Sequence, residues 1–239
     1  MQDYIFTIGL QNSVTKPLMS IKGLPNLVSL HLEYRNKIGV LETAKESKSH
    51  FQGIQPSDIK YLATVLRSMH CCCSLSITNS QIDDDLLRIF VEELNRREHN
   101  DNGEHLHIRD TLIDLDLSHN KISTEGLRLI TGCFLSSGSD TGNTEEDILA
   151  TLKFVGNSIR AEGARTLGRI LKTNKSLVTL DLCMNRLEDE GGKLLMDGII
   201  HHNNSLKNLR LTHNSMSNSS ISSFSQILKN SNTCLNIDW

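Results

Sequence analysis

The sequence contains few aromatic side chains and almost no proline. Aromatic residues make up 4% of the 239 residues and proline occurs 3 times, whereas 38% of the residues are hydrophobic. This apolar content is enough for a sizeable core, so a wholly disordered chain is excluded. Because burial must rest on leucine and isoleucine, the composition favours a regular, repetitive architecture over an aromatic-rich β-sandwich.

The sequence also lacks a dominant charge, a secretory signal and a long apolar run. The 25 basic and 28 acidic residues give a formal net charge of -3, so no global positive field is present to attract nucleic acid or an anionic membrane. Residues 1–14 have no basic segment, and no window approaches the roughly 20 apolar residues of a membrane span. We therefore predict a soluble chain with no nucleic acid and no membrane as partner.

Metal-binding cysteine spacing is absent as well. No C-x-x-C pair occurs among the six cysteines, which are Cys71, Cys72, Cys73, Cys133, Cys183 and Cys234. Contiguous residues on a strand point to opposite faces, so the first three cannot converge on one metal ion. The pattern indicates free, buried cysteines in a reducing compartment.

The remaining candidates for chemistry are weak. The densest group of metal-ligating side chains lies at residues 99–110, in an expected loop that no helix or strand holds together. The segment 188–193 lacks the complete phosphate-binding motif, and no nucleophile elbow is present for a Ser-His-Asp set. We therefore predict a protein that is not an enzyme and has no cofactor, no metal and no small-molecule substrate.

What the sequence does contain is a repeat. The pattern L-x-x-L-x-L-x-x-N-x-I, followed by a glycine and a helical apolar pattern, is clearest from Leu112 to Gly126. Three further copies start at Leu149, Leu177 and Leu206, the last three starts being 28 and 29 residues apart. Two weaker copies and a last half-copy begin at Leu27, Cys72 and Ile237.

Each copy has a physical interpretation. The L-x-L segment predicts a short strand with alternate residues pointing inward, and the glycine opens a helix with one apolar face. The asparagine caps backbone groups where the chain leaves the strand, and these structural asparagines are Asn120, Asn157, Asn185 and Asn214. Stacked units predict a right-handed α/β solenoid with a curved parallel sheet inside and helices outside.

The spacing of the copies predicts the domain organisation. Repeat starts are separated by 45, 40 and 37 residues in three places, instead of 28 or 29, which predicts inserted loops at 39–53, 96–110 and 136–146. Residues 1–23 contain no clear unit, so the repeat domain is expected to span 24–239, with about six repeats and a truncated last one. Because both ends lack a polar capping unit, we expect the chain to be a fragment or a truncated product.

The outward strand positions are the candidate binding residues. Four residues of alternating charge, Asp116, Lys153, Asp181 and Arg210, occupy the same position in consecutive repeats. Neighbours about 5 Å apart in a sheet can form ion pairs with one another, or the row can contact a partner. We predict a partner-binding concave face that consists of Asp114, Asp116, Lys153, Asp181 and Arg210.

The repeat resembles the ribonuclease-inhibitor class of leucine-rich repeats. The resemblance rests on units of 28 and 29 residues with the L-x-x-L-x-L-x-x-N-x-I pattern and the glycine that opens the helix. It implies a ribonuclease-inhibitor-like solenoid that binds proteins. The class includes ribonuclease inhibitors, Ran GTPase activators, nucleotide-sensing receptors and ciliary proteins, and the fold does not choose among them.

Three stretches, 24–34, 80–85 and 176–192, resemble the t-complex-associated testis-expressed family of leucine-rich-repeat subunits of the axonemal nexin-dynein regulatory complex. This resemblance implies a non-enzymatic scaffold that regulates dynein-driven sliding in motile cilia and flagella. Its expected partners are other regulatory-complex subunits, and its expected location is the cytoplasm, the cytoskeleton and the axoneme of a cilium or flagellum. The alternatives are a Ran-type GTPase-activating protein and a cytosolic leucine-rich-repeat sensor or inhibitor module.

Overall fold

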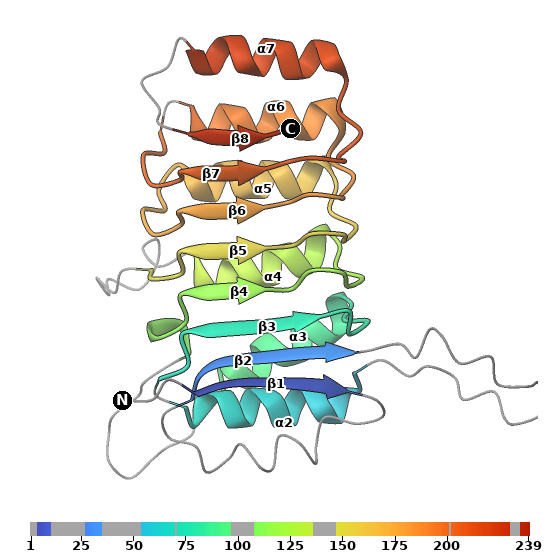
Figure 1. Cartoon of the computed structure of the whole chain (residues 1–239), viewed down its shortest axis with the longest axis vertical. Helices are drawn as coiled ribbons and strands as arrows, with labels where there is room; N and C mark the ends of the chain where they lie inside the picture. Colours follow the sequence, from blue (N-terminus) through green and yellow to red (C-terminus); the bar gives the residue numbers. More distant parts are fainter. Residues whose placement is uncertain are drawn as a thin grey trace, which may run out of the picture.

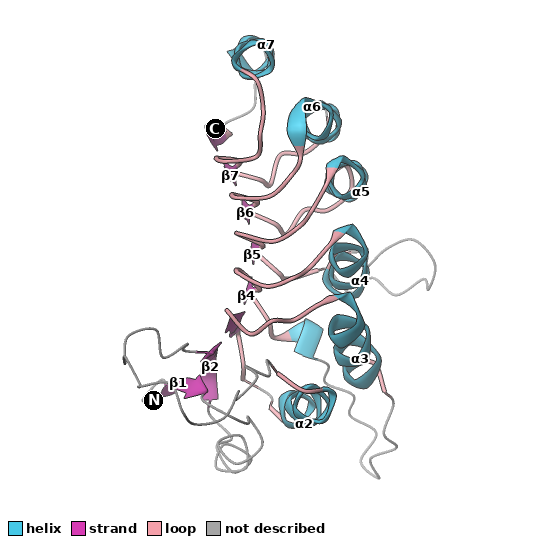
Figure 2. Cartoon of the chain, turned by 90° about the vertical axis from the view of Figure 1, so that its right-hand side faces the viewer, coloured by secondary structure: helices cyan, strands magenta, loops and turns pink. Residues whose placement is uncertain are grey.

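The computed structural model describes residues 4–10, 27–34, 54–69, 71–96, 108–135, 147–200, 202–229 and 235–239. Within these ranges the chain forms one parallel sheet of eight strands in the order β1 to β8, so each strand pairs with its neighbours in sequence. Most of the helices lie behind the sheet in Figure 1 and on one side of it in Figure 2, and the last helix stands beyond the C-terminal strands. The other face of the sheet is left open by the described helices.

Strands and helices alternate through most of the chain. The strands are β1 (Tyr4–Leu10), β2 (Leu27–Tyr34), β3 (Ser74–Thr78), β4 (Asp114–Asp116), β5 (Thr151–Lys153), β6 (Thr179–Asp181), β7 (Asn208–Arg210) and β8 (Asn236–Asp238). The helices are α2 (Pro56–Arg67), α3 (Asp84–Leu94), α4 (Thr124–Phe134), α5 (Ala161–Leu171), α6 (Glu188–Ile199) and α7 (Asn218–Lys229), with a 3-10 helix η1 (Ile108–Asp110). Among the described residues, no helix is long and apolar enough to cross a membrane.

The core is a row of aligned aliphatic residues beneath the sheet. The central residues of adjacent strands stand in register, and this inner row is Leu30, Leu75, Leu115, Leu152, Leu180, Leu209 and Ile237. All of them except the last belong to the buried core. The regular leucine spacing therefore produces a continuous core, and the predicted leucine-rich-repeat solenoid is confirmed.

The four repeat asparagines lie buried where the chain leaves each strand. Asn185, for example, donates from Nδ2 to the carbonyl oxygens of Phe154 at 2.8 Å and Leu182 at 3.0 Å, and its Oδ1 accepts from the amide of Ile159 at 3.0 Å. Phe154 and Ile159 belong to the preceding repeat. Each asparagine in this way satisfies backbone groups of two repeats at once.

Helices α5 and α6 approach each other closely at two glycines. A Cβ atom on Gly198 would lie 2.2 Å from the carbonyl oxygen of Gly168, and one on Gly168 would lie 2.6 Å from the carbonyl oxygen of Leu194. No side chain fits between these helices at this point. The glycines therefore allow the helix layer to pack as tightly as the strand layer requires.

The structure differs from the predicted boundaries in two places. Tyr4–Leu10 form β1 and pair in parallel with β2, although residues 1–23 contain no repeat pattern. The segment is rich in β-branched and aromatic residues, which favour a strand without the leucine spacing. The predicted loop 96–110 ends earlier than expected because Ile108–Asp110 form η1. The predicted loops 39–53 and 136–146, and residues 97–107, lie outside the described residues.

Candidate functional site

The open face of the sheet carries a row of polar side chains. Figure 2 shows the strands in a bowed column, with β1 and the C-terminus displaced toward the open side, so this face is concave. The register aligns the residues of what we call the middle row, which are His31, Ser76, Asp116, Lys153, Asp181, Arg210 and Asp238. Four of these were expected from the sequence, and the sheet register adds His31, Ser76 and Asp238.

Charges of the middle row pair with one another. Lys153 Nζ lies 3.7 Å from Asp116 Oδ2, and Arg210 contacts both Asp181 at 2.9 Å and Asp238 at 3.3 Å. The field of Asp181 and the hydrogen bond to Asp238 raise the pKa of Arg210 above its usual value. Of the two interpretations that the sequence leaves open, pairing within the row is therefore realised in the structure.

Asp181 does not lie on the accessible surface. Its side chain is 4% exposed, whereas that of Arg210 is 54% exposed. Asp181 Oδ1 also accepts the amide of Cys183 at 3.1 Å. Sequence alternation places Asp181 on the outward side, but the neighbouring Arg210 and the turn after β6 enclose it. A partner at this position would therefore contact Arg210 and not Asp181.

Asp114 differs from the other carboxylates of the face. It lies on β4, two residues before Asp116, and is partly exposed. Among the described residues its side chain has no ion pair, whereas Asp116 pairs with Lys153 and Asp181 pairs with Arg210. Asp114 is thus a predicted site residue with its charge still available to a partner.

The concave face is hollowed between β2 and β5. A hollow with a volume of about 270 Å³ is lined by His31, Ser74, Leu75, Ser76, Asp114, Leu115, Asp116, Thr151 and Lys153. Its shape follows from side-chain length. The outward side chains of β3 in the lining are the short Ser74 and Ser76, which lie between the longer His31 on one side and the aspartates of β4 on the other. His31 Nε2 lies 2.8 Å from Ser29 Oγ, which fixes the imidazole at the rim.

An apolar strip borders the hollow at the start of the strands. Ile113 is 43% exposed and Val178 is 38% exposed, and Ala150 lies between them. Backbone hydrogen bonds join the three in sequence, from Ala150 to Ile113 and from Val178 to Ala150. The repeat pattern does not predict this strip, because its residues fall at a variable position of the repeat and carry no motif.

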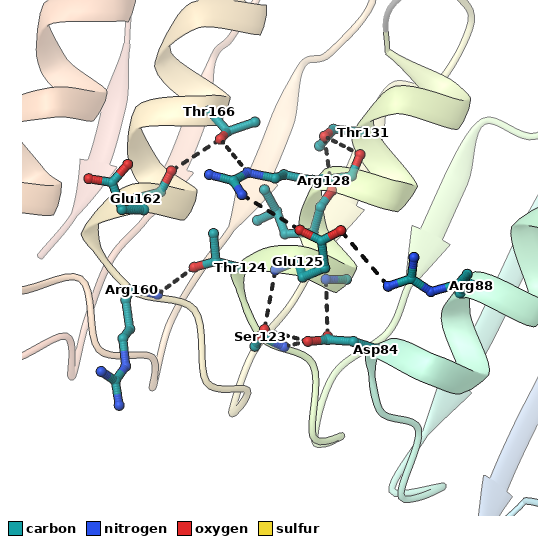
Figure 3. A network of polar contacts seen from close by, with 12 residues as sticks. Asp84, Arg88, Ser123, Thr124, Glu125, Arg128, Thr131, Arg160, Glu162 and Thr166 are labelled. Carbon is teal, nitrogen blue, oxygen red and sulfur yellow. Dashed lines mark hydrogen bonds and ion pairs between the residues drawn. The ribbon is translucent and has the colours of Figure 1, made fainter.

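The helical side uses its polar groups for contacts between repeats (Figure 3). Asp84 of α3 accepts the amides of Ser123 at 2.8 Å and Gly126 at 3.0 Å, so it caps the start of α4. Glu125 lies 4.0 Å from Arg88 and 3.6 Å from Arg128. The contacts of Asp84 and Arg88 hold α3 against α4, whereas the pair of Glu125 with Arg128 lies within α4.

Five of the six cysteines lie in the described residues, and Cys234 lies outside them. Within the described ranges no group of three or more His, Cys, Asp or Glu residues is placed to hold a metal ion. Burial raises the pKa of the Cys72 thiol to about 12 and that of Cys133 to about 11, so both are protonated at neutral pH. Cys71 is exposed, so the prediction of a buried thiol is wrong there, because it precedes β3.

Comparison with known families agrees with the fold. A family model described as leucine-rich repeat matches residues 111–130 and 173–196. These matches cover β4 with the first part of α4, and the whole of β6 with most of α6. Together with the strand order and the aligned leucines, they define this chain as a leucine-rich-repeat solenoid.

Particular relatives share parts of the chain. The mouse NACHT, LRR and PYD domains-containing protein 4C is 28% identical over 174 residues, which cover 66% of this chain and 17% of that protein. The mouse ribonuclease inhibitor is 32% identical over 128 residues, 53% of this chain and 26% of the inhibitor. The solved structure of leiomodin-1 actin-binding site 2 gives a TM-score of 0.47 at 14% identity, covering 80% of this chain and 91% of that one. The chain thus matches about a quarter or less of each curated relative named here.

Proposed function

We propose that this chain is a non-enzymatic protein-binding module that holds its partner on the concave face of the sheet. The observation that carries the proposal is the placement of the middle row and the hollow on a face that no described helix covers. On the helical side, the ion pairs of Arg88 with Glu125 and of Arg165 with Glu190 join neighbouring repeats. Solenoids of this type present an extended concave surface, which suits a protein ligand better than a small molecule.

The relatives support a partner that is itself a protein. The mouse ribonuclease inhibitor is, by its name, a protein that acts on an enzyme. A sensor or inhibitor module is therefore the form of the proposal that the relatives favour, and it predicts one-to-one binding of a protein ligand. The match covers 26% of that inhibitor, so we do not infer from it that this chain binds a ribonuclease.

A charge swap tests the proposal. Asp116→Lys combined with Lys153→Asp keeps the net charge and the ion pair but inverts the pattern on the concave face. We expect the folded chain to lose most of the proteins that the wild type captures from a cell lysate, measured by quantitative mass spectrometry. The control swap is Glu93→Arg with Arg96→Glu, which inverts a pair of 3.5 Å at the end of α3 and should leave capture unchanged. The proposal would be contradicted if neither swap reduced protein capture, or if only the control swap reduced it.

A second candidate is the axonemal scaffold, which the three stretches 24–34, 80–85 and 176–192 favour through their resemblance to the nexin-dynein regulatory-complex subunits. The names of the relatives found do not point to an axoneme. The test is localisation of the tagged chain in a motile-ciliated cell, followed by detergent and salt extraction. Retention along the axoneme until high salt would support this role, whereas a diffuse pool would favour the sensor or inhibitor module.

The enzyme-class alternative is a Ran-type GTPase-activating protein. Such an activity needs an arginine or asparagine directed at the nucleotide from a loop edge. Among the described residues, the four repeat asparagines are buried and bonded to backbone groups. GTP hydrolysis by Ran, measured with and without the chain, is expected to proceed at the same rate.

A further inference from the structure

We propose that the hollow between β2 and β5 accepts a lysine or arginine side chain of the protein partner. The inference rests on the proposed function and specifies the chemistry of its ligand. In the hollow, Lys153 neutralises Asp116 at 3.7 Å, but Asp114 has no ion pair within the described residues. The lining therefore carries one uncompensated negative charge, and a basic side chain supplies its complement.

The shape of the hollow suits a long side chain. Its volume of about 270 Å³ leaves room for a methylene stem, whereas the side chains of Leu75 and Leu115 at its floor are buried in the core. The hydroxyl groups of Ser74 and Ser76 stand opposite Asp114 and Asp116 in the sheet register. They can accept hydrogen bonds from the same ammonium or guanidinium group that pairs with Asp114. An arginine has the donors for a carboxylate and a hydroxyl together.

A free metal ion fits the hollow poorly. Calcium takes six to eight oxygen ligands at short distance, and magnesium demands near-octahedral geometry. Only Asp114 offers an uncompensated carboxylate in the lining, and no cluster of three ligating side chains occurs in the described part of the chain. A single carboxylate among hydroxyl groups instead matches the charge of one side-chain cation.

The apolar strip adds a second requirement on the partner. Ile113 immediately precedes Asp114, and Val178 lies two strands further along, a distance of about 10 Å at the spacing of a sheet. A segment that places its basic residue in the hollow therefore brings the adjacent residues over exposed apolar side chains. The expected ligand is a segment with a lysine or arginine flanked by aliphatic or aromatic residues.

Fluorescent peptide pools test this inference. One pool has a fixed central lysine or arginine between apolar residues, and the matched pool has glutamine at the centre. We expect the wild-type chain to prefer the basic pool in fluorescence anisotropy, and Asp114→Asn to weaken that binding by about tenfold, as expected for the loss of a charged hydrogen bond. The control variant Asp85→Asn removes an equal charge from the exposed surface of α3 and should leave the affinity unchanged.

Three results would overturn the inference: equal binding of the two pools, unchanged affinity in Asp114→Asn, or an equal loss in Asp85→Asn. These results are distinguishable from failure of the proposed function. If the Asp116 and Lys153 swap still abolishes protein capture while the pools bind equally, the concave face is the binding surface but its partner is not chosen by a basic side chain. If the swap also has no effect, both proposals fail.

Discussion

The two sides of the same short strands differ in a consistent way. The inward position of β3 to β7 is leucine in every strand, and each of these leucines is buried. The outward position beside it changes from serine to aspartate, lysine, aspartate and arginine. Packing selects one residue type on the inner side, whereas the outer side is free to vary. If the outward side binds the partner as proposed, stability and recognition depend on alternate residues of one strand, and mutations can separate them.

The largest effect is expected from the inner row. Leu180→Ala removes a fully buried side chain and should lower the free energy of unfolding by about 2 to 5 kcal/mol. The neighbouring Thr179→Ala, on the outward side of the same strand, should change it by less than about 1 kcal/mol. Urea titration followed by circular dichroism measures both. Equal losses in the two variants would break the proposed separation.

A smaller loss is expected from the asparagine that links two repeats. Asn185→Ala leaves the carbonyl oxygens of Phe154 and Leu182 and the amide of Ile159 without their partner, which should cost about 1 to 3 kcal/mol. Asn208→Ala is the matched control, because Asn208 lies exposed on the outward side of β7. If both variants unfold at the same urea concentration, the buried side-chain amide of Asn185 does not stabilise the stacked repeats more than an exposed asparagine does.

The same contrast extends to the helix layer. Gly198→Ala forces a methyl group against the backbone of Gly168 and should destabilise the chain by about 1 to 3 kcal/mol. Outside its own helix, a Cβ atom on Gly132 of α4 would meet no atom of the described residues within 4 Å, so Gly132→Ala should stabilise the chain by about 0.5 to 1 kcal/mol. The midpoint temperature of thermal unfolding should fall for Gly198→Ala and rise for Gly132→Ala. A shift in the same direction for both would show that helices α5 and α6 leave room for a methyl group at Gly198.

The smallest effects are expected within the middle row. Lys153→Met removes a partly exposed ion pair and should lower the free energy of unfolding by less than about 1 kcal/mol. The difference between this variant and the wild type should shrink as salt is added. Arg210→Met should cost more than Lys153→Met, because it leaves the buried carboxylate of Asp181 without its cation. Urea titrations at low and high salt measure the loss of stability in each variant. A larger loss in Lys153→Met than in Arg210→Met would contradict the burial of Asp181.

The repeat pattern predicted what depends on spacing, and missed what depends on neighbours in space. Regular spacing alone predicts the strands from β4 to β8 and their register, because each unit has the same inward leucines at the same positions. The hollow depends on short serines of β3 beside His31, which lies 45 residues earlier than Ser76 in the sequence. The enclosure of Asp181 depends on the side chain of Arg210 from the next repeat. A motif that describes one unit contains neither contact.

Site-specific photo-crosslinking tests the central claim most directly. A photoreactive residue at Ser76, inside the hollow, is compared with one at Lys172, an exposed residue at the end of α5 on the helical side. If the concave face binds the partner, Ser76 should form a crosslink to it and Lys172 should not. A crosslink from Lys172 with none from Ser76 would place the partner on the helices and contradict the account.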